Sequence, residues 1–421
     1  DARLPVVWIE APADAPVATA WATALPQLNQ AREMLGNGGP VFVVLAGPPG
    51  FDALVAQRAP DLWSVIRTPI VFGEPLMHVG DAPRPFQWLH VSDIHMREEA
   101  DWRADVVLDA LVRDLPKQLE AAQVAPDAVF LTGDVAWSGK PKEYTAVQGF
   151  LRALFEALKL DPHTQLHLVP GNHDVDRRAV SRLVRNDQQR LLTLEGEAFR
   201  GEVGEIVGEP EELAPYGARL TAWSQFVTHV CGPARGVSPS QPWRVDEVGL
   251  GAYTVGVAAL CSAWACGPDE DKTGRILLGE RQVRAALSEL KHCPVRVALL
   301  HHPLDWLHEA ERDTVSELLR AEFHLVLHGH LHQTRSLAVT GGAGTSLVSG
   351  AGAAYAGSSW KHGVQAGHFD PTTGAVSLRA WTYSPGDGGY WHVDPALGRD
   401  VKDGVLRYTL KPVVAAAAQR P

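Results

Sequence analysis

The sequence predicts an α/β fold of layered sheets and helices, with an inserted helical cap and a small additional α/β unit near the start of the chain. Two observations predict it. Between residues 87 and 385, apolar segments of strand length alternate with stretches whose apolar residues follow helical spacing. The chain also has 421 residues, of which 45% are hydrophobic, and this is enough for one large core or two domains.

Residues 1–80 are predicted to form the small accessory α/β module. VVWIE and PVFVVLAG are typical of strands, and the stretch from Val17 to Leu35 is typical of a helix that GNGG would end. GPPG follows the second strand but lacks the Lys-Ser/Thr pair of a phosphate-binding loop, so we expect a packing module here. GDAPRPF, residues 80–86, is typical of a linker.

Residues 86–410 are predicted to form the main domain. Its strands are expected within FQWLHVSD, DAVFLTGD, QLHLVPGN, YTVGVAAL, VRVALLHH and FHLVLHGH. ADVVLDALVRDL lies between the first two and is expected to be a helix, which Pro116 would kink or end. Residues from about 178 to 245 interrupt the alternation and are rich in Arg, Gln, Glu and Gly, which favours an inserted cap. Residues 411–421 are expected to be a tail.

Charge and cysteine usage narrow the function classes. A formal net charge of -11 and the lack of any Lys/Arg-rich run argue against a duplex-binding protein. The four cysteines form no CxxC pair, so we expect reduced thiols and a cytoplasmic location. No apolar run approaches the ~20 residues of a membrane helix, so no membrane partner is expected. Since the first residue is Asp1 and not Met, the chain is expected to be a processed form or a piece of a longer protein.

Metal-binding residue types follow five of the predicted strands. The segments are Asp93-x-His95, Gly133-Asp134, Gly171-Asn172-His173-Asp174, His301-His302-Pro303 and His328-Gly329-His330-Leu331-His332. One such strand end is common by chance, but five in succession are not. In an open α/β sheet, ligands bind at the carboxyl ends of the strands. The set consists of oxygen and imidazole ligands without thiolate, which suits manganese, iron or zinc.

This ordered set resembles the calcineurin-like metallophosphoesterase superfamily over about residues 86–385. FQWLHVSDIH and LVPGNHD look most like the bacterial branch that includes the class III cyclic-nucleotide phosphodiesterases. The first 80 residues and the long insertion depart from that branch. The resemblance implies a layered αββα metallophosphoesterase sandwich for the main domain.

The resemblance also implies a site with two divalent metal ions, for which manganese is favoured and iron or zinc are alternatives. One ion would be held by Asp93, His95 and His332, the other by Asn172, His301 and His330, and Asp134 would bridge both. His173 would lie beside the substrate phosphate and stabilise charge or protonate the leaving group. Asp174 would support catalysis by orienting His173 or a ligand imidazole.

Two functions are carried forward. The first is hydrolysis of phosphoester bonds by a metal-bridging hydroxide, as a phosphodiesterase or phosphatase acting on a nucleotide or other small phosphate ester. The second is a nuclease effector acting on DNA or RNA, regulated through a protein partner or sensor function of residues 1–80. Arginines 177, 178, 182 and 185 are the local basic cluster that would serve it, whereas size and net charge favour the first. Trp137 could stack on a base, but burial is the favoured interpretation.

Overall fold

The computed structural model describes residues 6–10, 42–46, 83–99, 101–267, 272–341, 344–357, 360–395, 397–398 and 401–414. The chain divides into two compact units, Asp1–Met77 and His78–Pro421. In the first unit, β1 (Val6–Glu10) and β2 (Phe42–Ala46) form a parallel pair, as the strand patterns predict. The predicted helix from Val17 to Leu35 lies outside the described residues, and the accessory role of residues 1–80 stays a prediction.

The second unit contains two sheets. The first has the order β14-β13-β12-β3-β4-β5, with β15 paired to β13; its strands are β3 (Phe86–Val91), β4 (Ala128–Leu131), β5 (Leu166–Leu168), β12 (Gly363–Phe369), β13 (Ala375–Ser384), β14 (Tyr390–Val393) and β15 (Leu406–Thr409). The second has the order β10-β11-β9-β8-β7-β6; its strands are β6 (Trp243–Gly249), β7 (Thr254–Leu260), β8 (Val295–Leu299), β9 (Leu325–His328), β10 (Arg335–Gly341) and β11 (Gly344–Gly350). The six strands predicted in the main domain are all present.

Alternation along each central strand explains how the layers pack. Successive side chains of a strand point to opposite faces, so Phe86 and Trp88 of β3 join one apolar cluster and Leu89 and Val91 join the other. The first cluster also contains Val295 and other residues of the second sheet and forms the core between the sheets. The strands are apolar on both faces because helices cover the outer faces.

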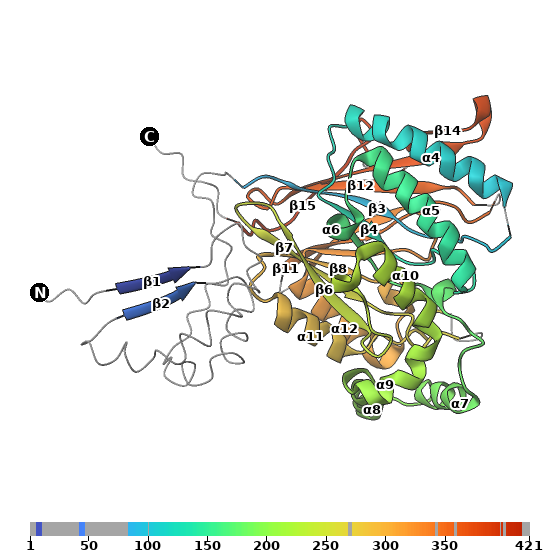
Figure 1. The fold of residues 1–421 in the computed structure, drawn as a ribbon, viewed down its shortest axis with the longest axis vertical. Helices are drawn as coiled ribbons and strands as arrows, with labels where there is room; N and C mark the ends of the chain where they lie inside the picture. The colour runs from blue at the N-terminus through green and yellow to red at the C-terminus, as the bar shows by residue number, and fades with distance from the viewer. Residues whose placement is uncertain are drawn as a thin grey trace, which may run out of the picture. The chain divides into compact units, whose positions relative to one another are not determined.

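Helices flank the two sheets, as Figure 1 shows for α4 and α5 on one side and for α11 and α12 on the other. Their bounds are α4 (Trp102–Ala121), α5 (Pro141–Leu158), α6 (Pro162–Gln165), α11 (Glu280–Leu290) and α12 (Glu309–Glu322). The order of layers is therefore helix, sheet, sheet, helix, which confirms the predicted fold class. The expectation that Pro116 ends its helix is wrong: α4 continues to Ala121, because Leu115 and Leu119 are buried in the core on either side of the proline.

The insertion consists of four helices, α7 (Arg182–Leu191), α8 (Gly196–Gly208), α9 (Pro210–Gly217) and α10 (Thr221–Cys231). The residues from Trp243 onward, which the sequence analysis placed partly in the cap, form β6 at the edge of the second sheet. Within the predicted tail, the N–H groups of Val413 and Val414 donate to the carbonyl of Pro371, and residues 415–421 lie outside the described part. A search of the described helices finds none long and apolar enough to cross a membrane.

The parallel strands determine where the polar segments meet. β3, β4 and β5 run parallel in the first sheet, and β7, β8 and β9 run parallel in the second. The carboxyl ends of parallel neighbours lie along one edge of a sheet. The loops that follow β3, β4, β5, β8 and β9 carry all the predicted metal ligands.

Candidate metal centre

The loop after β3 holds the first two predicted ligands against the loop after β4. The N–H of Asp93 donates to the carbonyl of Gly133 at 3.0 Å, and the N–H of His95 donates to the carbonyl of Asp134 at 2.9 Å. Ile94 lies between them and is completely buried, which anchors the loop in the core. The two strand ends are thus joined by their backbones before any side chain contributes.

Five of the seven predicted ligands have a left-handed backbone. The φ angles are 55° at Asp93, 50° at His95, 54° at Asp134, 71° at His330 and 52° at His332. This conformation costs a non-glycine residue roughly 1–2 kcal/mol. Such strain persists only where the surrounding structure enforces it, and it concentrates at functional sites. The strain here coincides with the predicted ligands.

Asp93, His95 and His332 form the first ligand group. Oδ1 of Asp93 lies 3.2 Å from Nε2 of His332 and 3.7 Å from Nε2 of His95, and the two Nε2 atoms are 3.1 Å apart. This oxygen is buried and accepts no hydrogen bond from any described residue. A buried carboxylate oxygen that faces two imidazole nitrogens is a costly arrangement that a bound cation would stabilise. The residues therefore fit a metal ion.

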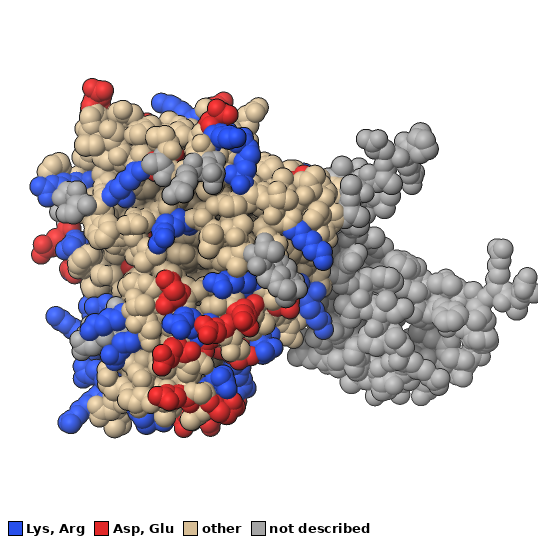
Figure 2. Space-filling view, turned by 180° about the vertical axis from the view of Figure 1, so that it is seen from behind, with Lys and Arg blue, Asp and Glu red and all other residues tan. Residues whose placement is uncertain are grey.

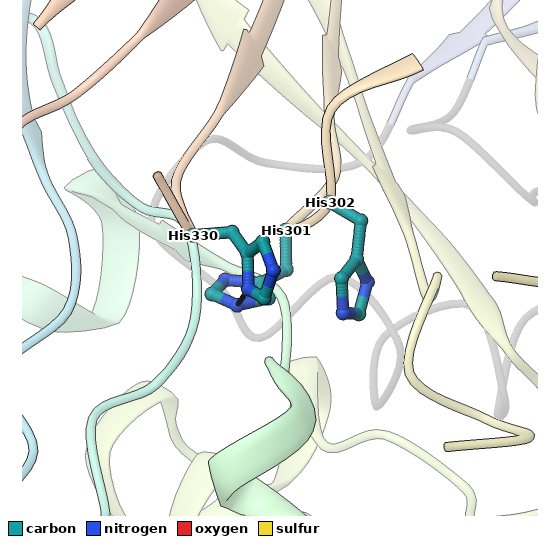
Figure 3. Close-up of side chains that lie close together, drawn as sticks. All are labelled: His301, His302 and His330. Carbon is teal, nitrogen blue, oxygen red and sulfur yellow. Dashed lines mark hydrogen bonds between the residues drawn. The ribbon is translucent and has the colours of Figure 1, made fainter. Parts of the chain in front are cut away.

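Asn172, His301 and His330 form the second group. Nε2 of His301 lies 3.1 Å from Oδ1 of Asn172 and 3.2 Å from Nδ1 of His330. Nδ1 of His301 donates to the carbonyl of Thr132 at 2.6 Å, so Nε2 faces the centre. Figure 3 shows the His301 and His330 rings meeting at this contact, with the His302 ring beside them.

Asp134 lies between the two groups. Its Oδ2 is 3.2 Å from Nε2 of His301 in the second group and 4.0 Å from Nε2 of His95 in the first. Its Oδ1 accepts the backbone N–H of His173 at 2.8 Å. One buried carboxylate therefore faces ligands of both groups, as the sequence predicts for the bridging residue.

The charges of the centre also suit cations. Burial alone would raise the pKa of Asp134, but the neighbouring His301 outweighs it and the pKa lies well below its usual range. Burial lowers the pKa of His95 to about 4 and that of His330 to about 3. Burial also acts to lower the pKa of His301, but the carboxylates of Asp134 and Asp93 outweigh it and raise the pKa to about 9. At neutral pH the centre therefore combines ionised carboxylates with two neutral imidazoles, the forms that bind metal, while His301 must release its proton to a competing cation.

Close packing around Asp134 gives a first testable prediction. A Cβ at Gly171 would lie 2.2 Å from Oδ1 and 2.6 Å from the backbone nitrogen of Asp134. We expect Gly171→Ala to displace the carboxylate, to destabilise the fold by about 1–3 kcal/mol, and to reduce the bound metal measured by elemental analysis. Gly149→Ala in α5 is the matched control, because its Cβ would meet no atom within 4 Å and alanine favours the helix. Equal metal content in the two variants would contradict this prediction.

His173 and Asp174 do not contact each other as the sequence analysis anticipates. The half-buried His173 ring packs against His95, and its Nδ1 donates to the carbonyl of Trp137 at 2.7 Å, which leaves Nε2 available. The Asp174 carboxylate accepts hydrogen bonds from backbone N–H groups and from the hydroxyl of Tyr144; the N–H donors are Val135, Ala136 and Gly171. Burial and the charge of Asp134 raise the pKa of Asp174 to about 7. Among the described residues, Asp174 orients the turn after β4 and no imidazole.

The remaining histidines of the motif lie outside the two groups. His302 is fully buried, and its Nδ1 is 2.8 Å from Oγ of Ser262. His328 is also buried, with Nδ1 3.0 Å from the carbonyl of Gly329. The spacing that favours His301 over His302 as the ligand agrees with these positions, since it is His301 that contacts Asp134.

Three tryptophans surround the centre, and sequence reasoning singled out one of them. The ring of Trp137 lies 4.9 Å from that of His173, Trp306 lies 4.2 Å from His330, and Trp360 lies 4.7 Å from His332. Trp137 is 39% exposed, so the favoured interpretation that it is buried is wrong. No motif marks Trp306 or Trp360, which only the fold brings to the ligands.

Comparison with known proteins agrees with this geometry. Residues 86–232 match the model of the calcineurin-like phosphoesterase family, and this stretch carries four of the seven predicted ligands. The chain is 32% identical over 122 residues to a cAMP/cGMP dual specificity phosphodiesterase of Mycobacterium tuberculosis, which is 28% of this chain and 36% of that protein. It is 34% identical over 86 residues to the glycerophosphodiester phosphodiesterase GpdQ of Enterobacter lignolyticus, which is 20% of this chain and 28% of that protein. The chain thus spans about a third of the length of these curated relatives.

Among solved structures, a purple acid phosphatase from yellow lupin aligns with 73% of this chain and 54% of its own, at 12% identity and a TM-score of 0.39. The family model begins at the first residue of β3 and includes the Asp93, Asp134 and Asn172 loops. Clusters of Asp and His at these loops form candidate sites for the divalent ions that this family uses. From β3 onward, this chain belongs to the calcineurin-like phosphoesterase family.

Proposed function

We propose that this chain hydrolyses phosphoester bonds with a pair of divalent metal ions, as a phosphodiesterase. The observation that carries the proposal is the position of Asp134. Its Oδ2 is 3.2 Å from a histidine of one ligand group and 4.0 Å from a histidine of the other, and no described lysine or arginine pairs with it. A structural ion pair would need one carboxylate and one cation, whereas this arrangement places a shared carboxylate between two clusters of neutral ligands.

Asp93, His95 and His332 would hold one ion, Asn172, His301 and His330 would hold the other, and Asp134 would contact both. When bound, the two ions supply stabilisation of the phosphoryl oxygens and a water molecule that is deprotonated near neutral pH. The absence of thiolates from the ligand set favours manganese, with iron or zinc as alternatives.

His173 is proposed to act on the leaving group. Hydrolysis forms one P–O bond to the oxygen of water and breaks the P–O bond to the leaving oxygen, which then needs a proton. Nδ1 of His173 keeps its proton, because the carbonyl of Trp137 can only accept. Nε2 is therefore the atom that donates a proton to the leaving oxygen and recovers one afterwards. Asp174 supports this step indirectly by holding the turns that carry Asp134 and His173.

The two phosphodiesterases to which the chain is similar act, by their names, on cyclic nucleotides and on glycerophosphodiesters. Both kinds of substrate are phosphodiesters, which favours a diester over a monoester. The test is a turnover panel in the presence of Mn²⁺ that contains an aryl monoester, an aryl diester, cyclic nucleotides and a glycerophosphodiester. We expect the diesters to be cleaved and EDTA to abolish the reaction. Turnover of the monoester alone would contradict the diester assignment.

A second candidate is a nuclease, and a surface feature favours it. Arg178, Arg182 and Arg185 follow the Asn172 loop, are exposed, and form no ion pair with the described carboxylates. In Figure 2, Lys and Arg side chains gather at the lower left, the side where α7 lies after the half-turn from Figure 1, while Asp and Glu gather nearer the centre. Single-stranded DNA added to the same panel decides between the candidates. Cleavage that falls with the triple variant of these arginines to alanine would favour the nuclease.

Two further expectations remain proposals. Residues 1–80 are proposed to contact a protein partner or to act as a sensor. A cytoplasmic location is favoured by the four cysteines, Cys231, Cys261, Cys266 and Cys293, which are all buried and free.

A further inference from the structure

Trp360 is a large apolar side chain left exposed beside the metal centre. It is 46% exposed, and its ring meets that of His332 edge to face at 4.7 Å. His332 in turn lies 3.1 Å from His95 and 3.2 Å from Asp93. Among the described residues, no other ring and no cation stacks on Trp360, and its indole nitrogen forms no hydrogen bond.

Trp137 lies on the other side of the same ligand pair. Its ring centroid is 5.7 Å from that of His95 and 4.9 Å from that of His173. Its exposed surface differs from that of Trp360, because the guanidinium of Arg97 lies over the ring at 3.7 Å. Trp137 is therefore already stacked against a protein group, while Trp360 is available to a ligand.

The two tryptophans thus flank a connected pair of ligands, since Trp137 contacts His95 and Trp360 contacts His332. An exposed indole costs free energy in water, and exposed apolar side chains gathered at one place mark a binding site. An aromatic base has a π-face that stacks on indole whatever its sequence, and each such contact contributes substantially to binding. A glycerol or ethanolamine group has no such face.

We infer that Trp360 is a specificity-determining residue, which selects phosphodiesters with an aromatic base by stacking on that base while the phosphate lies at the metal centre. The inference rests on the proposed function and names its substrate class as nucleotide diesters. It also separates the two activities of the similar proteins, because cyclic nucleotides carry a base and glycerophosphodiesters do not. Trp137 with Arg97 would line the opposite side of the entrance.

The test compares kcat/KM for 3′,5′-cyclic AMP with kcat/KM for glycerophosphoethanolamine in the Mn²⁺-loaded protein. We expect Trp360→Ala to lower kcat/KM for cyclic AMP by about 5-fold to 100-fold, mainly through KM, and to leave the base-free diester within about 2-fold. Trp360→Phe should recover most of the loss, since it restores a stacking face. Tyr390→Ala is the matched control, because Tyr390 is an exposed aromatic residue on β14 whose ring contacts His392 alone among the described rings.

A binding measurement by calorimetry gives a readout independent of turnover. The Kd for AMP should rise by a similar factor in Trp360→Ala, whereas the Kd for ribose 5-phosphate should not change. Equal losses for both substrates, or a preference of the wild-type protein for the base-free diester, would overturn the inference and leave the phosphodiesterase proposal intact. Failure to cleave either diester would instead overturn the proposed function.

Discussion

Asp134→Asn is expected to abolish most metal binding and to lower turnover by more than about 100-fold, the upper end of the loss that an outer-shell partner causes. The side chain keeps its shape, and its oxygen can still accept the N–H of His173. The charge, however, is lost at the one carboxylate that faces both ligand groups. An amide would also turn N–H donors toward His301 and His95, where a cation is proposed to lie.

Elemental analysis and thermal unfolding measure this effect together. Asp134→Asn should remain folded, because the substitution removes a buried charge without leaving a cavity. His332→Ala should lose metal from the first group only, and so retain more metal than Asp134→Asn. Asp114→Asn is the control, since Asp114 pairs with Arg113 on the exposed side of α4. Normal metal content and turnover in Asp134→Asn would show that Asp134 does not bridge.

His173→Ala is expected to retain both metals and to lose turnover by ~10²–10⁴, the usual contribution of a general acid. The metals should remain because the contact of this residue with Asp134 is made by its backbone N–H, which alanine keeps. The loss should be larger for an alkyl diester than for an activated aryl diester, since the poorer leaving group needs the proton more. His229→Ala in α10 is the matched control, because His229 is an exposed histidine of the cap.

Two outcomes would change the role of His173. Equal losses for the alkyl and aryl diesters would indicate stabilisation of charge without proton transfer. Loss of metal from the variant would place His173 among the ligands, which its position within reach of His95 and Asp134 makes a real test.

The central layers were predictable because their pattern is dense. β3, β4, β7, β8 and β9 are nearly continuous apolar runs, and such runs indicate strands that are covered on both faces. The predicted ligands were legible for a related reason: each follows directly after a strand, so the parallel order of the strands brings them together.

Other features depended on contacts between distant segments. The edge strand β6 is half exposed and polar, with the sequence WRVDEVG, and so resembled part of the cap. The partner of Asp174 could not be read from its place beside His173, because the turn aims its carboxylate at the backbone after β4. Trp360 lies 28 residues after His332 and carries no motif, so only the folded chain reveals their contact.

Metal stoichiometry tests the central claim most directly. The wild-type protein is loaded with Mn²⁺, freed of excess metal by gel filtration, and analysed for manganese per chain, with Asp134→Asn treated in the same way. Two ligand groups that share one carboxylate predict two ions per chain in the wild-type protein and a loss of most of this metal in the variant. A wild-type protein that binds no metal, or that hydrolyses phosphodiesters equally well once metal-free, would contradict the account.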